Sequence, residues 1–192
     1  MSAHQGEPAG EAAQAAAPTG GRRLERTIAL VGMMGVGKST VGRKLAESLA
    51  APFVDSDEEI EKAAGLSVQE IFAMHGDPEF RRGERRVIER LLSGPPVVLA
   101  TGGGAYMDPT TRALLKETAV TVWLRADLDL IWKRVNRRDT RPLLKRENPR
   151  QVLADLLTAR APVYAEADLT VDSGDGPAND AVKTICAALG YA

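Results

Sequence analysis

The stretch GMMGVGKST, residues 32–40, lies between a short apolar run and a segment with helical periodicity. Its spacing, from Gly32 to Ser39, is G-x-x-x-x-G-K-[ST]. Glycines at these positions let the backbone point its N–H groups at phosphate oxygens, and the start of a helix adds partial positive charge. In this pattern Lys38 reaches the β- and γ-phosphates and the Ser39 hydroxyl binds Mg2+. The context makes a chance glycine-rich turn a poor explanation, so the stretch predicts a site for a nucleoside triphosphate with magnesium.

Short apolar runs alternate with helical patterns along the rest of the chain. We expect strands at residues 27–32, 52–57, 97–100, 120–124 and 169–171. We expect helices at residues 38–49, 67–72, 77–92, 108–116, 127–135, 148–164 and 177–189. Strands and helices that alternate in this way form an α/β fold, with a parallel sheet covered on both faces. Ligands bind such sheets at the carboxyl ends of the strands, so site residues should follow strands.

Length and composition indicate one globular domain, over residues 23–192. The chain has 192 residues, is 44% hydrophobic and 27% charged, and has a net charge of -1. That charge argues against a nucleic-acid partner held by a positive field. No run approaches the ~20 apolar residues that a membrane span needs. Cys186 lies in an apolar helical pattern, which predicts a buried, inert thiol.

Residues 1–22 differ from the rest of the chain. They are mostly Ala, Gly, Pro and Gln, with almost no large apolar side chains, so we expect a disordered tail. The tail has neither the apolar core of a signal peptide nor the arginine-rich, acid-poor composition of a transit peptide. We therefore expect a cytoplasmic protein.

Two classes of phosphate-loop protein fit the first motif, a GTPase switch and a small-metabolite kinase. No D-x-x-G occurs in the chain, and the segment NRRD (136–139) has arginine where the guanine-binding N-K-x-D has lysine. It also follows a helix rather than a strand. The sequence therefore favours a kinase, which needs an acceptor pocket beside the γ-phosphate.

Acceptor-pocket candidates follow the second and third expected strands. If the chain stays extended there, Asp55 and Asp57 face the same side. One could then hold the water shell of the metal and the other could take a proton from an alcohol. The alternative is that Asp57 only caps the next helix. TGGG (101–104) suits a ligand that lies against the backbone, and the alternative is a flexible loop.

Arg81 is the main candidate for binding an anion. On a helix, Phe80, Glu84, Val87 and Leu91 share an inward face, and a carboxylate there needs a cation. We expect Glu84 to hold Arg81 and aim it inward, toward the carboxylate of an acceptor. The alternative is a plain exposed ion pair. The other arginines of the segment fit a solvated, salt-bridged face: Arg82, Arg85, Arg86 and Arg90.

Two further arginines lie later in the chain. Residues 136–149 are polar, basic and non-periodic, which suits a lid that brings Arg141 onto the phosphates. An ordinary surface loop is the alternative. Arg160 lies near the end of its helix, where Pro162 disturbs the backbone. Spacing alone leaves open whether it is a second anion contact.

These stretches together resemble the shikimate kinase family, from about Thr27 to Leu189. The resemblance is carried by GMMGVGKST (32–40), D-x-D (55–57), IFAMHGDPEFRRGE (71–84), TGGG (101–104), RPLL (141–144) and RAPVY (160–164). The phosphate loop is widely shared. The F-R-R helix, the glycine triplet and R-P-L-L in this order are much more specific.

The resemblance implies a fold and a reaction. The family transfers the γ-phosphoryl of ATP to the 3-hydroxyl of shikimate in aromatic amino-acid biosynthesis. Its fold is the nucleoside-monophosphate-kinase type of P-loop fold, with a five-stranded parallel sheet and a lid, expected here at about 136–149. An ordinary Walker-B aspartate is lacking in the family, and the segment VVLATGGG of this chain offers none either.

The resemblance also implies roles for single residues. Asp57 would bind the shikimate hydroxyls and act as base, and Asp55 would hold Mg2+ through water, beside Ser39. Arg134 would lie near the adenine. The catalytic residues implied are Lys38, Asp57 and Arg141. Those implied to bind ATP are Gly35, Val36, Gly37, Lys38, Ser39, Thr40, Arg134 and Arg141. Those implied to bind shikimate are Asp57, Phe72, Phe80, Arg81, Gly102, Gly103, Gly104 and Arg160.

Two other functions stay open on the sequence. One is another small P-loop kinase, such as a gluconate kinase, although the F-R-R helix and TGGG argue against it. The other is a nucleotide-binding regulatory module without an acceptor. The expected partners are ATP and shikimate, with no nucleic acid and no membrane, and the expected state is a monomer.

Overall fold

The centre of the fold is a parallel sheet of five strands in the order β2-β3-β1-β4-β5. The structure is a computed structural model and describes residues 24–136 and 147–191. The strands are β1 (Thr27–Val31), β2 (Phe53–Asp55), β3 (Val98–Ala100), β4 (Ala119–Arg125) and β5 (Leu169–Asp172). In the register, Ile28 of β1 pairs with Val98 on one side and Val120 on the other. The predicted parallel sheet is confirmed.

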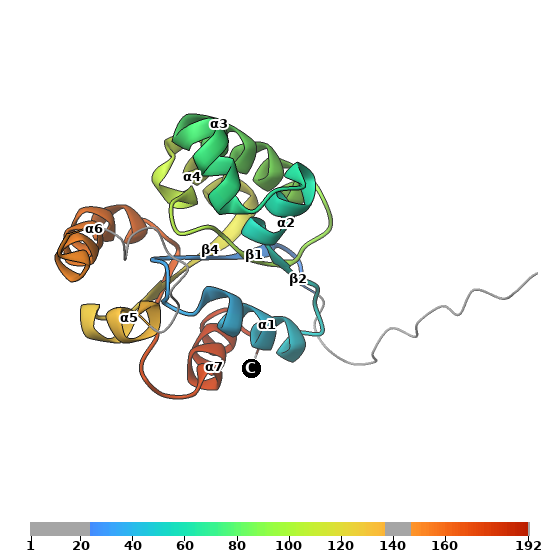
Figure 1. Cartoon of the computed structure of the whole chain (residues 1–192). Helices are drawn as coiled ribbons and strands as arrows, with labels where there is room; N and C mark the ends of the chain where they lie inside the picture. The colour runs from blue at the N-terminus through green and yellow to red at the C-terminus, as the bar shows by residue number, and fades with distance from the viewer. Residues whose placement is uncertain (1–23, 137–146, 192) are drawn as a thin grey trace, which may run out of the picture.

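Helices cover both faces of the sheet (Figure 1). They are α1 (Lys38–Ser48), α2 (Ser56–Ala64), α3 (Val68–Leu92), α4 (Pro109–Thr118), α5 (Leu128–Val135), α6 (Pro149–Tyr164) and α7 (Ala178–Ala188), with the 3-10 turn η1 (Ala105–Met107). In Figure 1, α1 and α7 lie on one face, and α2, α3 and α4 lie on the other.

Strand β1 shows why the sheet is buried on both sides. All five of its residues are buried, and successive side chains point to opposite faces. Ile28 and Leu30 pack in the cluster that contains residues of α1 and α7, while Ala29 and Val31 pack in the cluster that contains residues of α3 and α4. Cys186, on α7, belongs to the first cluster and is 8% exposed, so its predicted burial is confirmed.

The predicted strand 52–57 is wrong at its end. Strand β2 ends at Asp55, and α2 begins at Ser56. The Asp55 side chain is the N-cap and accepts a hydrogen bond from the Asp57 backbone N–H (3.1 Å). Carboxylates at this position stabilise a helix start, which favours the turn over continued extension. Asp57 therefore lies in the first turn of α2, and neither an extended Asp55–Asp57 pair nor a cap by Asp57 is observed.

Helix α3 contains the two helices expected at 67–72 and 77–92. Ser67 and Glu70 form the predicted capping box at its start. Gly76 has φ 75° and ψ 176°, so the helix kinks there, directly before Asp77 and Pro78. A positive φ of this kind favours glycine. The kink separates the short arm that carries Phe72 from the long arm that carries Phe80 and Arg81.

Some predictions fall outside the described residues. The expected tail (1–22) and most of the expected lid (136–149), with Arg141, lie in the ranges 1–23 and 137–146, which the structure does not describe. Within residues 24–136 and 147–191, no helix is both long and apolar enough to cross a membrane.

Candidate active site

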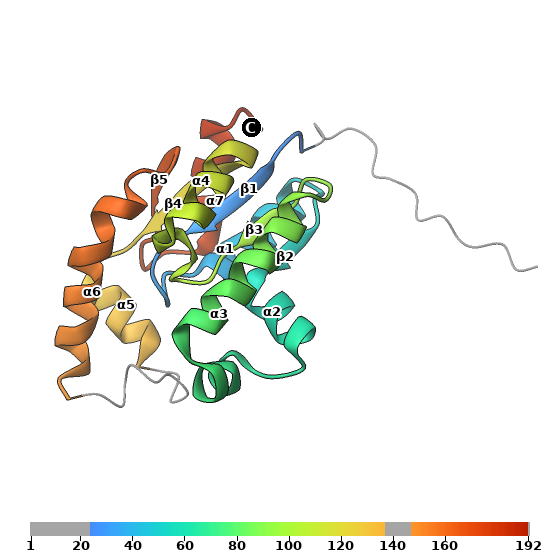
Figure 2. The ribbon, with the colours of Figure 1, turned by 90° about the horizontal axis from the view of Figure 1, so that it is seen from above.

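The segments that follow the strands come together at one edge of the sheet. The loop 32–37 follows β1, α2 follows β2 directly, and the glycines 102–104 follow β3. Figure 2 shows α3 and α6 on opposite sides of this edge. The rule that ligands bind at the carboxyl ends of parallel strands places the candidate site here.

The loop 32–37 has the backbone of a phosphate cradle. Gly32, Gly35 and Gly37 have φ values of 135°, 79° and 102°. A Cβ on Gly32 would lie 2.5 Å from the Leu124 carbonyl oxygen, and one on Gly35 would lie 2.6 Å from a methyl of Val135. These positions therefore need glycine. Gly37 is the N-cap of α1 and carries no capping side chain, so the first N–H groups of α1 can meet an anion.

Lys38 lies across this loop. Its ammonium donates hydrogen bonds to the carbonyl oxygens of Gly32 (2.8 Å) and Met33 (3.0 Å). Burial raises the pKa of the Asp57 carboxyl, and the charge of Lys38 acts against that rise. The cation therefore lies between the phosphate cradle and the start of α2, where it can act on groups from both.

Ser39 and Asp55 join the start of α1 to the end of β2. The Ser39 hydroxyl donates to Asp55 Oδ2 across 2.7 Å. A hydroxyl and a carboxylate in contact are the oxygen donors that Mg2+ takes, with phosphate oxygens and water as its other ligands. The residues present therefore fit a magnesium ion held with the nucleotide. Among the described residues, no group of three or more His, Cys, Asp or Glu side chains could hold a metal.

Asp57 is a half-buried carboxyl close to a second acid. Burial raises its pKa above the ordinary value of 3.8, and the nearby Asp55 raises it further. Lys38 and Arg81 act in the opposite direction and favour the charged form. A carboxyl with a raised pKa that lies beside cations in a cleft is a candidate for acid–base chemistry.

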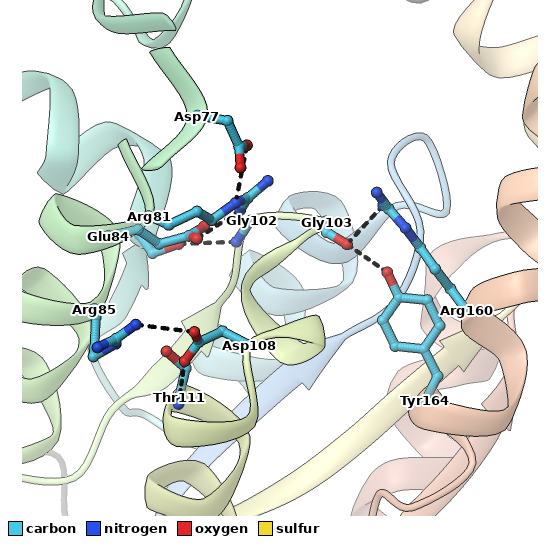
Figure 3. Close-up of polar contacts among 11 residues, drawn as sticks. Asp77, Arg81, Glu84, Arg85, Gly102, Gly103, Asp108, Thr111, Arg160 and Tyr164 are labelled. Carbon is cyan, nitrogen blue, oxygen red and sulfur yellow. Dashed lines mark hydrogen bonds and ion pairs between the residues drawn. The ribbon is translucent and has the colours of Figure 1, made fainter. Parts of the chain in front are cut away.

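Arg81 is held from two sides. It donates to Glu84 Oε2 across 2.6 Å, and its Nε lies 3.3 Å from Asp77 Oδ1. Glu84 is only 2% exposed, so the pair is not the exposed ion pair that was the alternative. Burial raises the pKa of Glu84, while Arg81 lowers it. The prediction that Glu84 holds Arg81 and aims it inward is confirmed (Figure 3).

Two phenylalanines form a wall beside Arg81. Phe72 and Phe80 are stacked, with ring centroids 4.3 Å apart, across the kink in α3. The Arg81 guanidinium carbon lies 5.1 Å from the centroid of Phe80 and 6.0 Å from that of Phe72. The two rings and the cation therefore lie together on α3, with Phe80 itself buried.

The glycine triplet gives space to side chains of the protein itself. A Cβ on Gly102 would lie 2.7 Å from both Asp57 Oδ1 and Glu84 Oε1, and one on Gly104 would lie 2.5 Å from Arg81 Nη2. The expectation that a ligand against the backbone explains the glycines is therefore incomplete. A Cβ at 102 or 104 would displace one of these side chains, so the described contacts favour glycine there without any ligand.

Arg160 reaches the same place from α6. It lines a cavity of about 340 Å³ together with Asp77, Arg81, Gly104, Met107 and Asp108. Its Nη1 donates to the Gly103 carbonyl oxygen across 3.3 Å (Figure 3). Two arginines from different helices therefore line one cavity, and the role of Arg160 as a second anion contact stays a prediction.

Arg134 lies on the other side of the phosphate loop. It donates to the carbonyl oxygens of Val36 (3.0 Å) and Gly174 (2.7 Å), and the buried Ser173 hydroxyl also donates to Val36 (2.9 Å). These contacts tie the phosphate loop to the segment after β5. Arg134 therefore contacts the phosphate loop at Val36 and does not line the cavity that Arg81 lines.

One arginine lies deeper than expected, and two contacts of the site were not expected. Arg85, expected on a solvated, salt-bridged face, does form a salt bridge, to Asp108 (3.0 Å), the N-cap of α4, but it is half-buried. The cause is the position of α4 beside α3, which no local pattern reveals. The Ser56 hydroxyl accepts from the Gly102 N–H (2.9 Å), and the Tyr164 hydroxyl donates to Gly103. The only signal for Tyr164 was its place in RAPVY.

The chain is similar in sequence and in fold to known proteins. The family model for shikimate kinase matches residues 34–190. A shikimate kinase of Caulobacter vibrioides is 57% identical over 164 residues, which cover 85% of this chain and 82% of that protein. The chain belongs to the shikimate kinase family. A shikimate kinase of Rhizobium meliloti is 50% identical over 165 residues, 86% of each chain.

Solved structures place the fold in the same family. A shikimate kinase from Acinetobacter baumannii in complex with shikimate superposes with a TM-score of 0.82 at 44% identity, covering 86% of this chain and 93% of that one. A gluconokinase from Sinorhizobium meliloti reaches a TM-score of 0.57 at 21% identity, which shows a shared fold alone. The expected P-loop fold of the nucleoside-monophosphate-kinase type is confirmed.

Proposed function

We propose that this member of the shikimate kinase family transfers the γ-phosphoryl of ATP to the 3-hydroxyl of shikimate. The products are shikimate 3-phosphate and ADP, and the step belongs to aromatic amino-acid biosynthesis. One observation carries the proposal: Arg81 and Arg160 line one cavity, Asp57 lies against the neighbouring Gly102, and Arg160 also reaches Met33 of the phosphate loop. An acceptor with both a carboxylate and an alcohol fits this arrangement.

The acceptor half of the site is proposed from the cavity. Arg81 and Arg160 bind the carboxylate of shikimate, since a planar guanidinium suits a carboxylate. Phe72 and Phe80 support the ring. Asp57 binds the hydroxyls, and the backbone of the glycines completes the pocket: Gly102, Gly103 and Gly104.

The nucleotide half is proposed from the cradle. The N–H groups at the start of α1 and the Lys38 ammonium bind the phosphates, and Arg134 lies near the adenine. Ser39 binds Mg2+ directly, and Asp55 binds it through water. The full set proposed for ATP is Gly35, Val36, Gly37, Lys38, Ser39, Thr40, Arg134 and Arg141.

The protein contributes mainly positioning and charge to phosphoryl transfer. Asp57 orients the 3-hydroxyl and accepts its proton as the oxygen attacks the γ-phosphorus. Burial raises the pKa of Asp57, which makes it a better proton acceptor than an exposed carboxylate, while Lys38 and Arg81 favour its charged form. Lys38 and Arg141 neutralise the negative charge that develops on the transferred group. Bound Mg2+ would supply further neutralisation of phosphate charge.

We propose that a single chain is sufficient for this activity. The described residues of the two proposed half-sites gather at one edge of one sheet, which supports a site that a monomer can hold. The whole of residues 23–192 would act as one domain, with 136–149 as its lid.

The identity of the product tests the proposal. The protein is incubated with Mg2+, ATP and shikimate, and the product is isolated and examined by mass spectrometry and phosphorus NMR. The expected product is shikimate that has gained one phosphoryl group, with phosphorus coupled to the proton on carbon 3. A phosphoryl group on another hydroxyl, or release of inorganic phosphate alone, would refute the assignment of Asp57 beside the 3-hydroxyl.

A further inference from the structure

Tyr164 connects α6 to the glycine triplet, and nothing assigned so far uses it. Its hydroxyl donates to the Gly103 carbonyl oxygen, and its side chain is almost fully buried, at 2% exposed. Arg160 lies four residues earlier on α6, so both side chains leave the same face of the helix. Figure 3 shows the two side chains converging on the carbonyl of Gly103.

The two donors are unequal. The distance to the Gly103 oxygen is 2.5 Å from the Tyr164 hydroxyl and 3.3 Å from Arg160 Nη1. Burial raises the pKa of the Tyr164 hydroxyl above its ordinary value of 10.0, so the group keeps its proton and remains a donor. Tyr164 therefore makes the closer contact to this oxygen, and Arg160 makes the longer one.

The other polar groups of the triplet bond to residues just after it in the chain or to α2. The Gly102 and Gly104 carbonyl oxygens accept from the N–H groups of Ala105 (3.1 Å) and Met107 (3.0 Å). The Gly102 N–H donates to Ser56. The Gly103 carbonyl is thus the point at which the described contacts tie the triplet to α6. This peptide is trans, so fixing the carbonyl also fixes the Gly104 N–H on the opposite side.

The arrangement has a consequence for Arg160. A buried carbonyl oxygen that loses its hydrogen-bond donor costs free energy. A side chain that is the sole donor to such an oxygen is therefore not free to turn away. If Arg160 alone held Gly103, binding a carboxylate would either leave that oxygen unpaired or pull the loop with it. Since Tyr164 also holds it, Arg160 can turn to another acceptor while the loop stays in place.

We propose that Tyr164 is a positioning residue, whose hydroxyl holds the Gly103 carbonyl and so leaves Arg160 available for the carboxylate of the acceptor. The inference rests on the proposed function, because the acceptor is taken to be shikimate. It predicts that the hydroxyl affects acceptor binding and leaves nucleotide binding unchanged.

Tyr164→Phe is the test variant, because it removes the hydroxyl and keeps the ring. The ring stacks on Trp123 and Tyr106, at centroid distances of 5.9 and 6.4 Å, so we expect it to remain in place. Tyr106→Phe is the matched control. Tyr106 is a buried tyrosine of the same stack, and its hydroxyl lies by Thr121 of β4, without a well-formed hydrogen bond to any described residue.

The experiment measures kcat, and the KM values for shikimate and for ATP, in the wild-type protein and both variants. Tyr164→Phe should raise the shikimate KM roughly tenfold, as expected for loss of one hydrogen bond to a buried acceptor. Its kcat and its ATP KM should stay within about twofold, because binding of substrate and transition state are weakened alike. Tyr106→Phe should match the wild type in all three constants.

Four results would overturn the inference. An unchanged shikimate KM in Tyr164→Phe would show that the hydroxyl positions nothing. A rise in both KM values, or an equal effect of Tyr106→Phe, would indicate general packing. Failure of the wild-type protein to use or bind shikimate would refute the proposed function itself, and this inference with it. If the thermal midpoint of Tyr164→Phe falls, the comparison is repeated in a Gly83→Ala background, which adds a methyl in open space on α3.

Discussion

The carboxylate of Glu84 and the guanidinium of Arg81 meet at 2.6 Å on α3, with the carboxylate buried beneath the cation. Asp77 contacts the Nε of the same guanidinium, so two carboxylates fix its direction. The edge that carries Nη2 lies against Gly104 and the cavity. An arginine oriented in this way meets a ligand without first losing side-chain freedom.

Arg81→Ala should therefore weaken acceptor binding. Removal of a charged hydrogen-bond donor predicts a rise in the shikimate KM of about 10- to 100-fold, with little change in the ATP KM. Arg82→Ala is the control, because Arg82 is the next residue and pairs with Glu79 on the exposed face of α3. Equal shifts in the two KM values would mean that Arg81 has a structural role only.

Asp57 should make the protein less stable as the pH rises, the opposite of a carboxylate whose pKa is lowered by folding. Its pKa is raised, chiefly by burial, so the folded protein binds this proton more tightly than the unfolded chain. The charged form therefore costs stability above the folded pKa, and this cost disappears as the pH falls through it. Asp57→Asn should raise the thermal midpoint at pH 7 and have a smaller effect near the ordinary carboxyl pKa of 3.8.

The same substitution should remove turnover, since asparagine cannot accept the proton. In the wild-type protein, kcat/KM should fall on the acid side as Asp57 becomes protonated, at a pH above the range of an ordinary aspartate. Calorimetry and a pH–rate profile measure the two effects. An Asp57→Asn variant that is active, or less stable at pH 7, would contradict this role.

Gly83 offers a stabilising change. It lies inside α3, and a Cβ there would meet nothing within 4 Å. Gly83→Ala should raise the free energy of unfolding by about 0.5–1 kcal/mol, through the lower entropy of the unfolded chain. Gly102→Ala is the contrast, because its methyl would lie 2.7 Å from two carboxylate oxygens. Thermal unfolding should separate the two, and a Gly83→Ala variant of lower stability would refute the open-space argument.

Ser39 should control the magnesium requirement. Ser39→Ala removes the hydroxyl that contacts Asp55, so the Mg2+ concentration for half-maximal activity should rise roughly tenfold. Ser39→Thr keeps a hydroxyl at the same place and should remain close to the wild type. Activity measured against Mg2+ concentration at saturating ATP tests this. If the wild-type protein and Ser39→Ala depend equally on Mg2+ concentration, Ser39 does not bind the ion.

The sequence predicted those features that depend on local pattern. The phosphate loop, the alternation of strands and helices, the capping box at Ser67 and the pairing of Arg81 with Glu84 all follow from residues close together in the chain. The site residues around them were reached through the family resemblance, and their roles stay predictions. The end of β2 was misjudged because the N-capping preference of Asp55 overrode the alternation that suggested a longer strand.

Features that depend on distant contacts could not be read locally. Arg85 is drawn to Asp108 by the packing of α4 on α3, and Tyr164 reaches Gly103 across 61 positions of sequence. The reason for the glycines at 102 and 104 is likewise a close approach of Asp57, Glu84 and Arg81. Each of these needs the tertiary structure, because the partner lies on another element.

Lys38→Ala is the control variant for the final measurement, because it should lose phosphate binding and keep the fold. The Lys38 ammonium contacts carbonyl oxygens of its own loop, so Lys38→Ala should leave the fold intact and abolish turnover. Any ADP release that this variant still shows is background, to be subtracted from the release by the wild-type protein.

The most direct measurement is ADP release from Mg2+-ATP by the wild-type protein and by Lys38→Ala, with shikimate, with gluconate and with no acceptor. Stimulation by shikimate alone, absent in Lys38→Ala, is the predicted result. Stimulation by gluconate in place of shikimate would contradict the acceptor while keeping the phosphate loop. No stimulation by either would contradict the assignment as a kinase of this acceptor class.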